Sequence, residues 1–235
     1  MKTKFPRDDE IGIRVKSTYR IHFSYFGYEW HFFVRSQSEE NIAKGCLTYY
    51  RDMWEKHDLS VEDIVLDVGA HSGFFTVPIS SQVGHVFAYE PSPANYQMLA
   101  HNVHMNNVDN VTHYQRAISS KDDMESFNLG VYGTTGHMLS SVGNKRGGVS
   151  VEVQCDSLES VLSTDKITVV KLDAEGIEWD LFAKTQNWSN VRLMVAELHK
   201  VTDDKMDILM MMLNREGFTN QVKHSSWFSK LTAWR

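Results

Sequence analysis

Residues 64–75 read IVLDVGAHSGFF, and this stretch decides the fold. An apolar run ends in Asp67, and Gly69 and Gly73 follow before a helical pattern begins. Glycines let a backbone approach a bound ligand without a Cβ clash, and the start of a helix offers unpaired N–H groups. Ligands of open α/β sheets bind at the carboxyl ends of the strands. The stretch therefore predicts a strand, a turn and a helix that form one side of a nucleotide-type cofactor site.

A carboxylate at the end of the next predicted strand narrows the cofactor class. The run HVFAYE ends in Glu90, which can accept both hydroxyls of an adenosine ribose, and Pro91 fixes the turn that follows. A dinucleotide loop needs G-x-G-x-x-G, but His71 stands where a middle glycine is expected. The amino group and sulfonium of S-adenosylmethionine suit nearby carboxylates better than a pyrophosphate does. We therefore expect S-adenosylmethionine as cofactor; a plain strand-to-helix turn with a solvated carboxylate is the alternative.

Strand-like and helix-like segments alternate along most of the chain, which is typical of an α/β fold with a mostly parallel sheet. Strands are predicted over residues 64–68, 86–90, 111–115, 149–155, 167–172, 192–198, 218–222 and 227–234. Helices are predicted over 73–81, 95–105, 157–162 and 203–216. Pro78 is expected to kink the first helix, and Asp203 and Gly217 are expected to cap the last one.

The N-terminal part has a different pattern. Two aromatic and β-branched runs within residues 11–34 face each other around Gly27 and predict a β-hairpin. Apolar residues at three- and four-residue spacing over 39–56 predict an amphipathic helix that packs on the sheet. We expect residues 1–60 to form this extension and residues 61–235 the cofactor-binding domain. Six glycines between residues 130 and 148 predict a long loop, either a functional lid or a plain insertion.

The composition argues against several classes of protein. A net charge of -6 and a pI near 6.0 disfavour a nucleic-acid-binding protein, which usually has a clear basic excess. Cys46 and Cys155 lie far apart, so neither a disulfide framework nor a structural zinc site is expected. No apolar run approaches the ~18 residues needed to cross a bilayer, and residues 1–10 do not resemble a signal peptide. We therefore expect a cytoplasmic protein without a membrane or nucleic-acid partner.

Four segments give the chain a specific resemblance. They are LDVGAHSGFFT at residues 66–76, YEPSPANYQMLAHNVHMN at 89–106, KLDAEGIEWDLF at 171–182 and AELH at 196–199. In this order they resemble the FkbM family of methyltransferases. The resemblance implies a Rossmann-like class I methyltransferase fold, in which a mostly parallel seven-stranded sheet carries helices on both faces. It also implies S-adenosylmethionine as the cofactor and methylation of oxygen, often on a sugar or a natural product.

The resemblance also implies roles for single residues. The methionine end of the cofactor would be lined by residues of the first segment, namely Asp67, Gly69, Ala70 and Gly73. Glu90 would hold the ribose beside Pro91, and Ala117 would lie near the adenine. The active site would be reached by residues of the third segment, namely Lys171, Asp173, Glu175, Gly176 and Glu178. His71 and Ser72 replace the family's usual Asn-Ile pair, and His71 would still present a donor to the cofactor.

Acidic side chains gather after two neighbouring predicted strands. Asp173 follows one strand, where we expect it to contact both cofactor and acceptor. Glu197 and His199 are two residues apart at the end of the next strand and therefore point to the same side. Glu175 and Glu178 are three apart and would share a helix face. The cluster would serve catalysis, although it could instead hold a hard divalent cation or merely support loops; we expect no metal.

An alcohol acceptor needs a base to remove its proton. His199 is the first candidate because its usual pKa lies near neutrality, and Asp173 is the alternative. The leading hypothesis is therefore an O-methyltransferase acting on a small-molecule acceptor such as a sugar. A nicotinamide-dependent oxidoreductase on a related fold and a non-catalytic cofactor-binding subunit are the alternatives, because a fold does not fix a function. The acceptor and the oligomeric state stay open.

Overall fold

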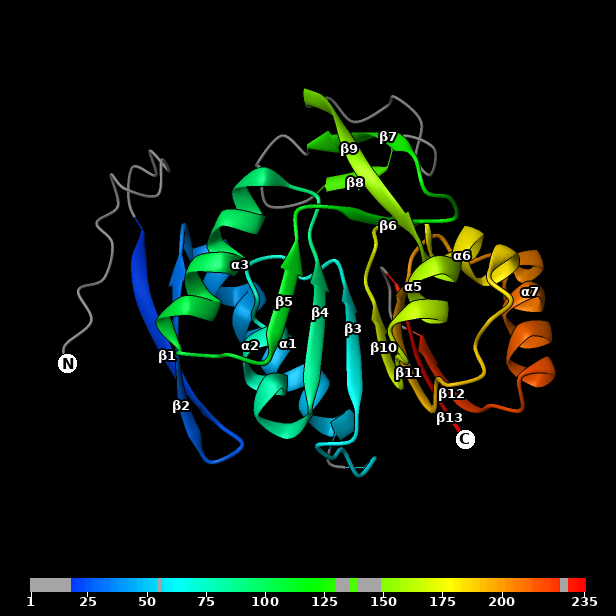
Figure 1. Ribbon diagram of the computed structural model, residues 1–235, viewed down its shortest axis with the longest axis horizontal. Helices are drawn as coiled ribbons and strands as arrows, with labels where there is room; N and C mark the ends of the chain where they lie inside the picture. The colour runs from blue at the N-terminus through cyan, green and yellow to red at the C-terminus, as the bar shows by residue number, and fades with distance from the viewer. Residues whose placement is uncertain (1–17, 55, 130–135, 139–148, 225–227) are drawn as a thin grey trace.

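A seven-stranded sheet forms the centre of the molecule (Figure 1). The computed structural model describes residues 18–54, 56–129, 136–138, 149–224 and 228–235. The strand order is β12-β13-β11-β10-β3-β4-β5. Four neighbouring pairs are parallel, and β13 runs antiparallel to both β11 and β12. The strands are β3 Ile64–Val68, β4 His85–Tyr89, β5 Val111–Tyr114, β10 Val169–Leu172, β11 Leu193–Leu198, β12 Thr219–His224 and β13 Ser229–Trp234.

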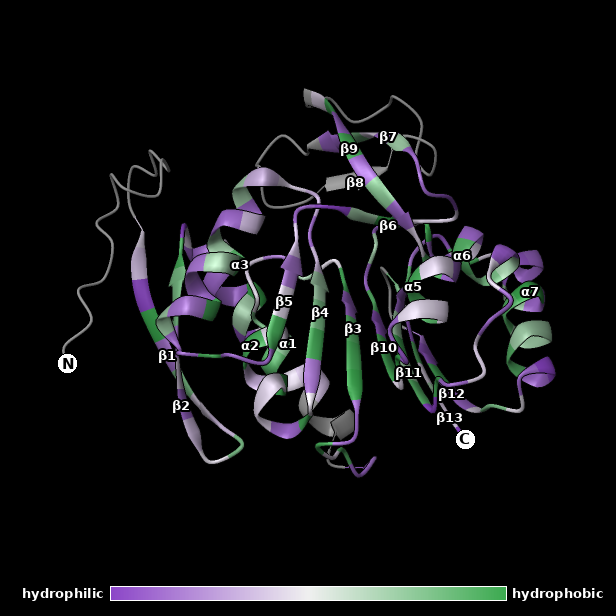
Figure 2. Ribbon diagram, viewed as in Figure 1, coloured by the Kyte–Doolittle hydropathy of each residue, from purple (hydrophilic) through white to green (hydrophobic). Residues whose placement is uncertain are grey.

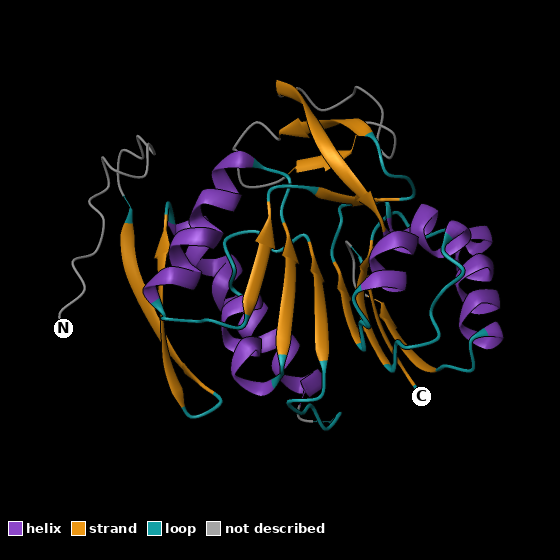
Figure 3. Ribbon diagram, viewed as in Figure 1, coloured by secondary structure: helices purple, strands orange, loops and turns teal. Residues whose placement is uncertain are grey.

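Helices cover both faces of this sheet, as the sequence predicts (Figure 3). The central strands are apolar along most of their length (Figure 2) and send alternate residues to opposite faces. Val65 of β3 packs with side chains of α1 and α2, whereas Leu66 packs in the cluster of α5, α6 and α7. The helices are α1 Gln37–Trp54, α2 Thr76–Ile79, α3 Pro93–Met105, α5 Leu158–Thr164, α6 Glu178–Lys184 and α7 Asp203–Arg215. Among the described helices, none is long and apolar enough to cross a membrane.

The predicted N-terminal hairpin consists of β1 Tyr19–Tyr25 and β2 Tyr28–Val34. Its two turn residues, Phe26 and Gly27, both have positive φ values, 54° and 78°, as a two-residue hairpin turn of type I′ requires. Two asparagines four residues apart, one in α3 and one at its C-cap, bind β2 like a neighbouring strand. Asn102 Oδ1 accepts from the backbone N–H of Phe33, and Asn106 Oδ1 accepts from that of His31, both at 2.9 Å. The hairpin is thereby fixed to the main sheet through α3.

A second, four-stranded sheet lies above the carboxyl ends of the main strands (Figure 1). Its members, in the order β6-β9-β7-β8, are β6 Ala117–Ser119, β9 Val149–Ser157, β7 Met124–Leu129 and β8 Gly136–Met138. The sequence predicts β9 but neither β6 nor β7, and the expectation of a continuous loop over 130–148 is wrong at 136–138. Their strand character comes from pairing across the chain rather than from a local pattern. Residues 130–135 and 139–148, the rest of the expected lid, lie outside the described residues.

The start of α2 and the N-cap of α7 differ from the predictions. The helix expected over 73–81 starts only at Thr76, because Gly73 has a φ of 83° and still belongs to the turn; a short 3-10 helix, Ser80–Gln82, follows α2. Pro78 lies in the first turn, where its missing N–H costs no hydrogen bond, and therefore causes no kink in the helix interior. The N-cap of α7 is Thr202 rather than Asp203, whereas Gly217 adopts the left-handed conformation expected after the helix.

Candidate cofactor and active site

A cavity of about 450 Å³ opens at the carboxyl ends of β3, β4, β10 and β11. Its walls come from the turn after β3, the end of β4, the small sheet, the segment after β10, helix α1 and the start of β13. This volume is within the range of small-molecule sites, roughly 300–1,000 Å³. The position is the one expected for ligands of open α/β sheets.

The turn after β3 follows the floor of the cavity. Gly69 has a φ of 75°, and a Cβ there would lie 2.0 Å from the backbone oxygen of Asp173. The end of β10 thus requires glycine at this position. Ala70 and His71 also line the cavity, as predicted from the motif, but Gly73 does not belong to its lining. A Cβ on Gly73 would lie 2.9 Å from Leu99 Cδ1, so this glycine permits close packing of α3.

Asp67 is placed differently from the prediction. The sequence assigns it to the cofactor, yet its side chain is fully buried and lies outside the cavity lining. Asp67 Oδ1 lies 3.0 Å from Lys171 Nζ, and Thr76 Oγ1 donates to Asp67 Oδ2 at 2.6 Å. Burial lowers the pKa of Lys171, but the Asp67 and Asp173 carboxylates outweigh it and raise that pKa above its usual value. Lys171 is therefore a charged group in the cavity floor, with Asp67 as its buried counterion.

Glu90 lies at the end of β4 and lines the cavity, although it is only 5% exposed. Its Oε2 accepts from the backbone N–H of His71 at 2.8 Å, and its Oε1 accepts from that of Ser92 at 2.9 Å. Burial raises the pKa of Glu90 to about 7, against the opposing effect of these hydrogen bonds. Near it the cavity wall is apolar and is formed by Pro91, Ala117, Ile118 and Phe127. The sequence missed Ile118 and Phe127 because it did not predict β6 and β7.

The predicted acidic cluster forms beside the ends of β10 and β11. His199 Nε2 lies 3.7 Å from Glu197 Oε1 and 3.8 Å from Glu175 Oε2. Asp173, Glu175 and Glu197 line the cavity, whereas His199 lies behind them. Within the described part of the chain, Asp173, Glu175 and His199 are also the one group whose ligand atoms, all within 4.8 Å of one another, could hold a metal ion. That no metal is needed stays a prediction.

Glu175 and Glu178 do not share a helix face. Glu175 and Gly176 have φ values of 54° and 112°, and α6 begins only at Glu178. Glu178 is fully buried; its Oε1 accepts from the backbone N–H groups of Ala174 and Gly176 at 3.1 Å and lies 3.0 Å from His199 Nδ1. It does not line the cavity. Glu178 therefore positions the turn and His199 rather than reaching a ligand.

Electrostatics separate the roles of Glu197 and His199. Burial lowers the pKa of His199, but its hydrogen bond to Glu178 and the charges of Glu178, Glu175 and Asp173 outweigh burial and raise that pKa above its usual value. Burial, with help from Asp173, raises the pKa of Glu197. An imidazole held in its protonated form cannot accept a proton at neutral pH, which disfavours His199 as the base. A carboxylate with a raised pKa is better suited to that task.

No single residue of the wall opposite the turn was predicted from the sequence, although the N-terminal part that contains α1 was expected to determine the substrate. This wall is formed by Ile42, Gly45, Cys46 and Tyr49 of α1, together with Phe228 and Lys230. Lys230 Nζ lies 3.3 Å from the centroid of the Tyr49 ring. The spacing in α1 predicts a helix that packs on the sheet, but it gives no sign that one edge of the helix faces a cavity.

Comparison with known proteins agrees with this geometry. The methyltransferase FkbM domain model matches residues 67–219. The chain belongs to the FkbM methyltransferase family. A relative of this FkbM-family chain, "Methyltransferase 1" of Beauveria bassiana (strain ARSEF 2860), is 22% identical over 192 residues, which cover 71% of the chain and 76% of the relative.

Solved structures show the fold of this FkbM-family methyltransferase. A T. thermophilus 16S rRNA N2 methyltransferase, in complex with AdoMet and guanosine, superposes with a TM-score of 0.54 at 10% identity, covering 93% of this chain and 50% of that one. M. jannaschii TYW2 in complex with AdoMet gives a TM-score of 0.49 at 14% identity, with coverages of 91% and 84%. The class I methyltransferase fold predicted from the sequence is confirmed. The antiparallel β13 between β11 and β12 also departs from the order 3-2-1-4-5-6 of the dinucleotide-binding fold, which argues against the oxidoreductase alternative.

Proposed function

We propose that this protein is an S-adenosylmethionine-dependent O-methyltransferase that acts on a hydroxyl group of a small molecule such as a sugar. One observation carries the proposal. A single cavity joins the buried carboxylate Glu90, at the end of β4, to the cluster of Asp173, Glu175 and Glu197 at the ends of β10 and β11. The AdoMet bound in the superposed T. thermophilus methyltransferase supports the choice of cofactor.

The chemistry of the cavity fits this cofactor. Glu90 would accept the ribose hydroxyls, and the apolar wall of Ala117, Ile118 and Phe127 would cover the adenine. The backbone at Gly69 and Ala70 and the carboxylate of Asp173 would bind the methionine end. The lining holds more carboxylates than ammonium groups, and one of the two ammonium groups, that of Lys171, is paired with Asp67 outside the lining. Such a lining suits a cationic ligand better than a pyrophosphate or a nucleic-acid backbone.

The wall formed by α1 and the start of β13 would bind the acceptor. The Lys230 ammonium lies over the face of the Tyr49 ring, 3.3 Å from its centroid, so this wall would offer the acceptor a hydrogen-bond donor beside an aromatic side chain. When bound, the cofactor supplies an electrophilic methyl group on a sulfonium. The protein must align the acceptor oxygen with that methyl, and alignment contributes several kcal/mol to catalysis.

Glu197 would remove the proton of the acceptor hydroxyl. It lines the cavity, it lies beside Asp173, and its raised pKa makes it a better base than an ordinary carboxylate. The protonated His199, held by Glu178, would stabilise the ionised form of Glu197 from behind. Asp173 stays the alternative base.

Calorimetry with S-adenosylmethionine and S-adenosylhomocysteine tests the cofactor first. We expect micromolar binding to the wild-type protein and a loss of at least tenfold in affinity for Glu90→Gln. A folded wild-type protein that binds neither compound contradicts the proposal. A screen of hydroxylated acceptors then compares Glu197→Gln with His199→Gln. Loss of the base should lower kcat about 100-fold or more without changing cofactor affinity. Methylated product from Glu197→Gln at the wild-type rate would exclude Glu197 as the base.

A further inference from the structure

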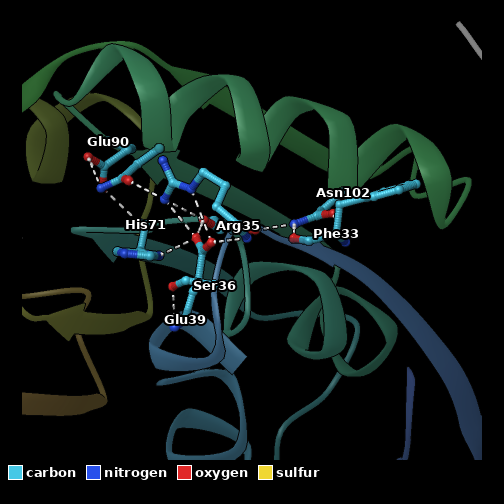
Figure 4. A network of polar contacts seen from close by, with 9 residues as sticks. Phe33, Arg35, Ser36, Glu39, His71, Glu90 and Asn102 are labelled. Atoms are coloured by element: carbon cyan, nitrogen blue, oxygen red, sulfur yellow. Dashed lines mark hydrogen bonds and ion pairs between the residues drawn. The ribbon is translucent and has the colours of Figure 1, made fainter. Parts of the chain in front are cut away.

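A buried ion pair in the N-terminal extension, Arg35–Glu39, contacts the turn after β3 (Figure 4). Both residues lie outside the part of the chain that the family model matches. Arg35 connects β2 to α1, and Glu39 lies in the first turn of α1. The guanidinium donates from Nε to Glu39 Oε2 at 3.0 Å and from Nη2 to Oε1 at 2.7 Å. The Glu39 side chain is fully buried and that of Arg35 is 12% exposed. A buried ion pair is stable only when its remaining N–H groups and oxygen atoms also have hydrogen-bond partners. Those partners show which parts of the molecule the pair holds in place.

Part of the geometry is an ordinary helix cap. Ser36 Oγ accepts from the Glu39 N–H at 3.2 Å, and Glu39 Oε2 accepts from the Arg35 N–H at 2.6 Å, much as in a capping box. A cap, however, needs no buried guanidinium, and this pair also reaches two other elements. Ser72 Oγ donates to Glu39 Oε1 at 2.5 Å, and Arg35 Nη2 donates to Asn95 Oδ1 at 2.7 Å.

Arg35 decides which way the amide of Asn95 faces. A guanidinium can only donate hydrogen bonds, so the oxygen of Asn95 must face Arg35 and its NH₂ group must face away. This orientation places Asn95 Nδ2 3.4 Å from Glu90 Oε1. Without Arg35 the Asn95 oxygen loses the donor that fixes it, and the amide no longer holds its NH₂ group at Glu90. The contact from one of the three donors to Glu90 would then be lost or loosened.

Glu39 holds the turn that supplies another of these donors. It binds Ser72 Oγ, and its Oε1 lies 3.8 Å from His71 Nδ1. His71 has a φ of 52°, in the left-handed region that residues with a side chain rarely adopt. This backbone conformation directs the N–H of His71 to Glu90 Oε2 at 2.8 Å. On the other side of the turn, Asn102 Nδ2 donates to the Ser72 carbonyl at 2.8 Å.

We propose that Arg35 and Glu39 are positioning residues of the cofactor site, which act through Asn95 and Ser72 to hold Glu90 ready to accept the ribose hydroxyls. Neither Arg35 nor Glu39 lines the cavity, so they act without touching the ligand. The proposal rests on the proposed function in taking that ligand to be the ribose of S-adenosylmethionine. The pKa of the Glu90 carboxyl group, which depends on its hydrogen-bond donors, can be measured without any ligand.

Two variants and one matched control separate positioning from general stability. Arg35→Lys keeps the charge beside Glu39 but loses the planar fork that orients Asn95. Ser72→Ala is a smaller change that cuts the bond between Glu39 and the turn. The control, Arg192→Lys, weakens another partly buried pair, in which Arg192 Nε lies 2.8 Å from Asp63 Oδ1 at the amino end of β3.

Two quantities are measured for each protein. The first is the pKa of the Glu90 carboxyl group in ligand-free protein, by carbon-13 NMR with Glu90→Gln for assignment. The second is the dissociation constant of S-adenosylmethionine, by calorimetry. The charged and titratable groups around Glu90 are His71 in the turn, Arg35 behind Asn95, and Lys171 from β10. Ser72→Ala replaces none of these three groups, and Arg35→Lys conserves the charge at its own position.

We expect the pKa of Glu90 to rise in Arg35→Lys and in Ser72→Ala, because each change removes or loosens a donor to its ionised form. The dissociation constant should increase about tenfold, as for the loss of one charge-assisted hydrogen bond. Arg192→Lys should lower Tm but change neither quantity. A wild-type Glu90 pKa in Arg35→Lys, or in Ser72→Ala if the first variant does not fold, overturns the proposal. Wild-type protein that fails to bind S-adenosylmethionine refutes the proposed function instead, and the Glu90 titration still decides the positioning role.

Discussion

Replacing Lys171 by methionine should destabilise the protein by about 3–5 kcal/mol. The Lys171 side chain is 4% exposed, and its ammonium lies 3.0 Å from Asp67 Oδ1. It also donates to the carbonyl groups of Val68 and Gly69 at 3.2 and 2.8 Å. Methionine has a similar length and volume, so little of the cost comes from a cavity. The cost arises because the fully buried carboxylate of Asp67 loses its counterion and keeps the hydrogen bond from Thr76.

Urea unfolding followed by circular dichroism measures this free energy. The double variant Lys171→Met/Asp67→Asn should recover most of the loss, because no charge is then buried without a partner. The control is Lys184→Met, which breaks the exposed Lys184–Asp180 pair of α6 at 2.8 Å and should cost less than about 1 kcal/mol. A Lys171→Met variant within about 1 kcal/mol of wild type, or a double variant no more stable than the single one, would refute the reasoning.

Three further predictions concern cofactor binding and the stability of the residues around the site. Cofactor affinity should fall about tenfold from pH 8 to pH 6, because the pKa of Glu90 is raised to about 7 and its ionised form, which prevails above that pH, is the better acceptor; calorimetry should show no such dependence for Glu90→Gln. Gly69→Ala should lower Tm far more than Gly27→Ala, since both glycines have positive φ but only the first Cβ would clash, 2.0 Å from the Asp173 carbonyl; equal values of Tm would contradict the clash. Asn102→Leu should cost about 2–3 kcal/mol in urea unfolding by leaving the part-buried N–H of Phe33 and the buried carbonyl of Ser72 without this partner, and a cost below about 0.5 kcal/mol would show that neither group needs it.

The sequence predicts those parts of the fold that depend on local patterns. Buried runs such as β3 and β10 stand out because both faces of a central strand are apolar. The position of Glu90 follows from its place at the end of such a run. The sequence does not show that Asp67 is buried against Lys171, because the pairing of β3 with β10 brings together two residues far apart in the chain. Similarly, the raised pKa of His199, which argues against this residue as the base, comes from carboxylates that only folding gathers around it.

The site also contains side chains that no local pattern marks. Tyr49 of α1 and Lys230 of β13 meet in one wall of the cavity, and a helical repeat does not tell which edge of α1 faces a ligand. In the sequence, Glu39 stands three residues after Ser36, which is the spacing of a capping box and gives no sign of the buried pair with Arg35. The contacts of this pair with Asn95 and Ser72 form only when α3 and the turn after β3 pack against it. Spacing along the chain does not show this packing.

The place of β13 has a consequence for the way the protein is made. This strand follows β12 in the chain, yet it lies between β12 and β11 and pairs with both. During translation β11 and β12 therefore leave the ribosome before the strand that joins them. Until β13 arrives, the apolar β11 has an open edge of the kind that favours aggregation. Lys230 belongs to β13 and lines the cavity. Pairing of β13 therefore both covers the edge of β11 and brings Lys230 into the wall of the site.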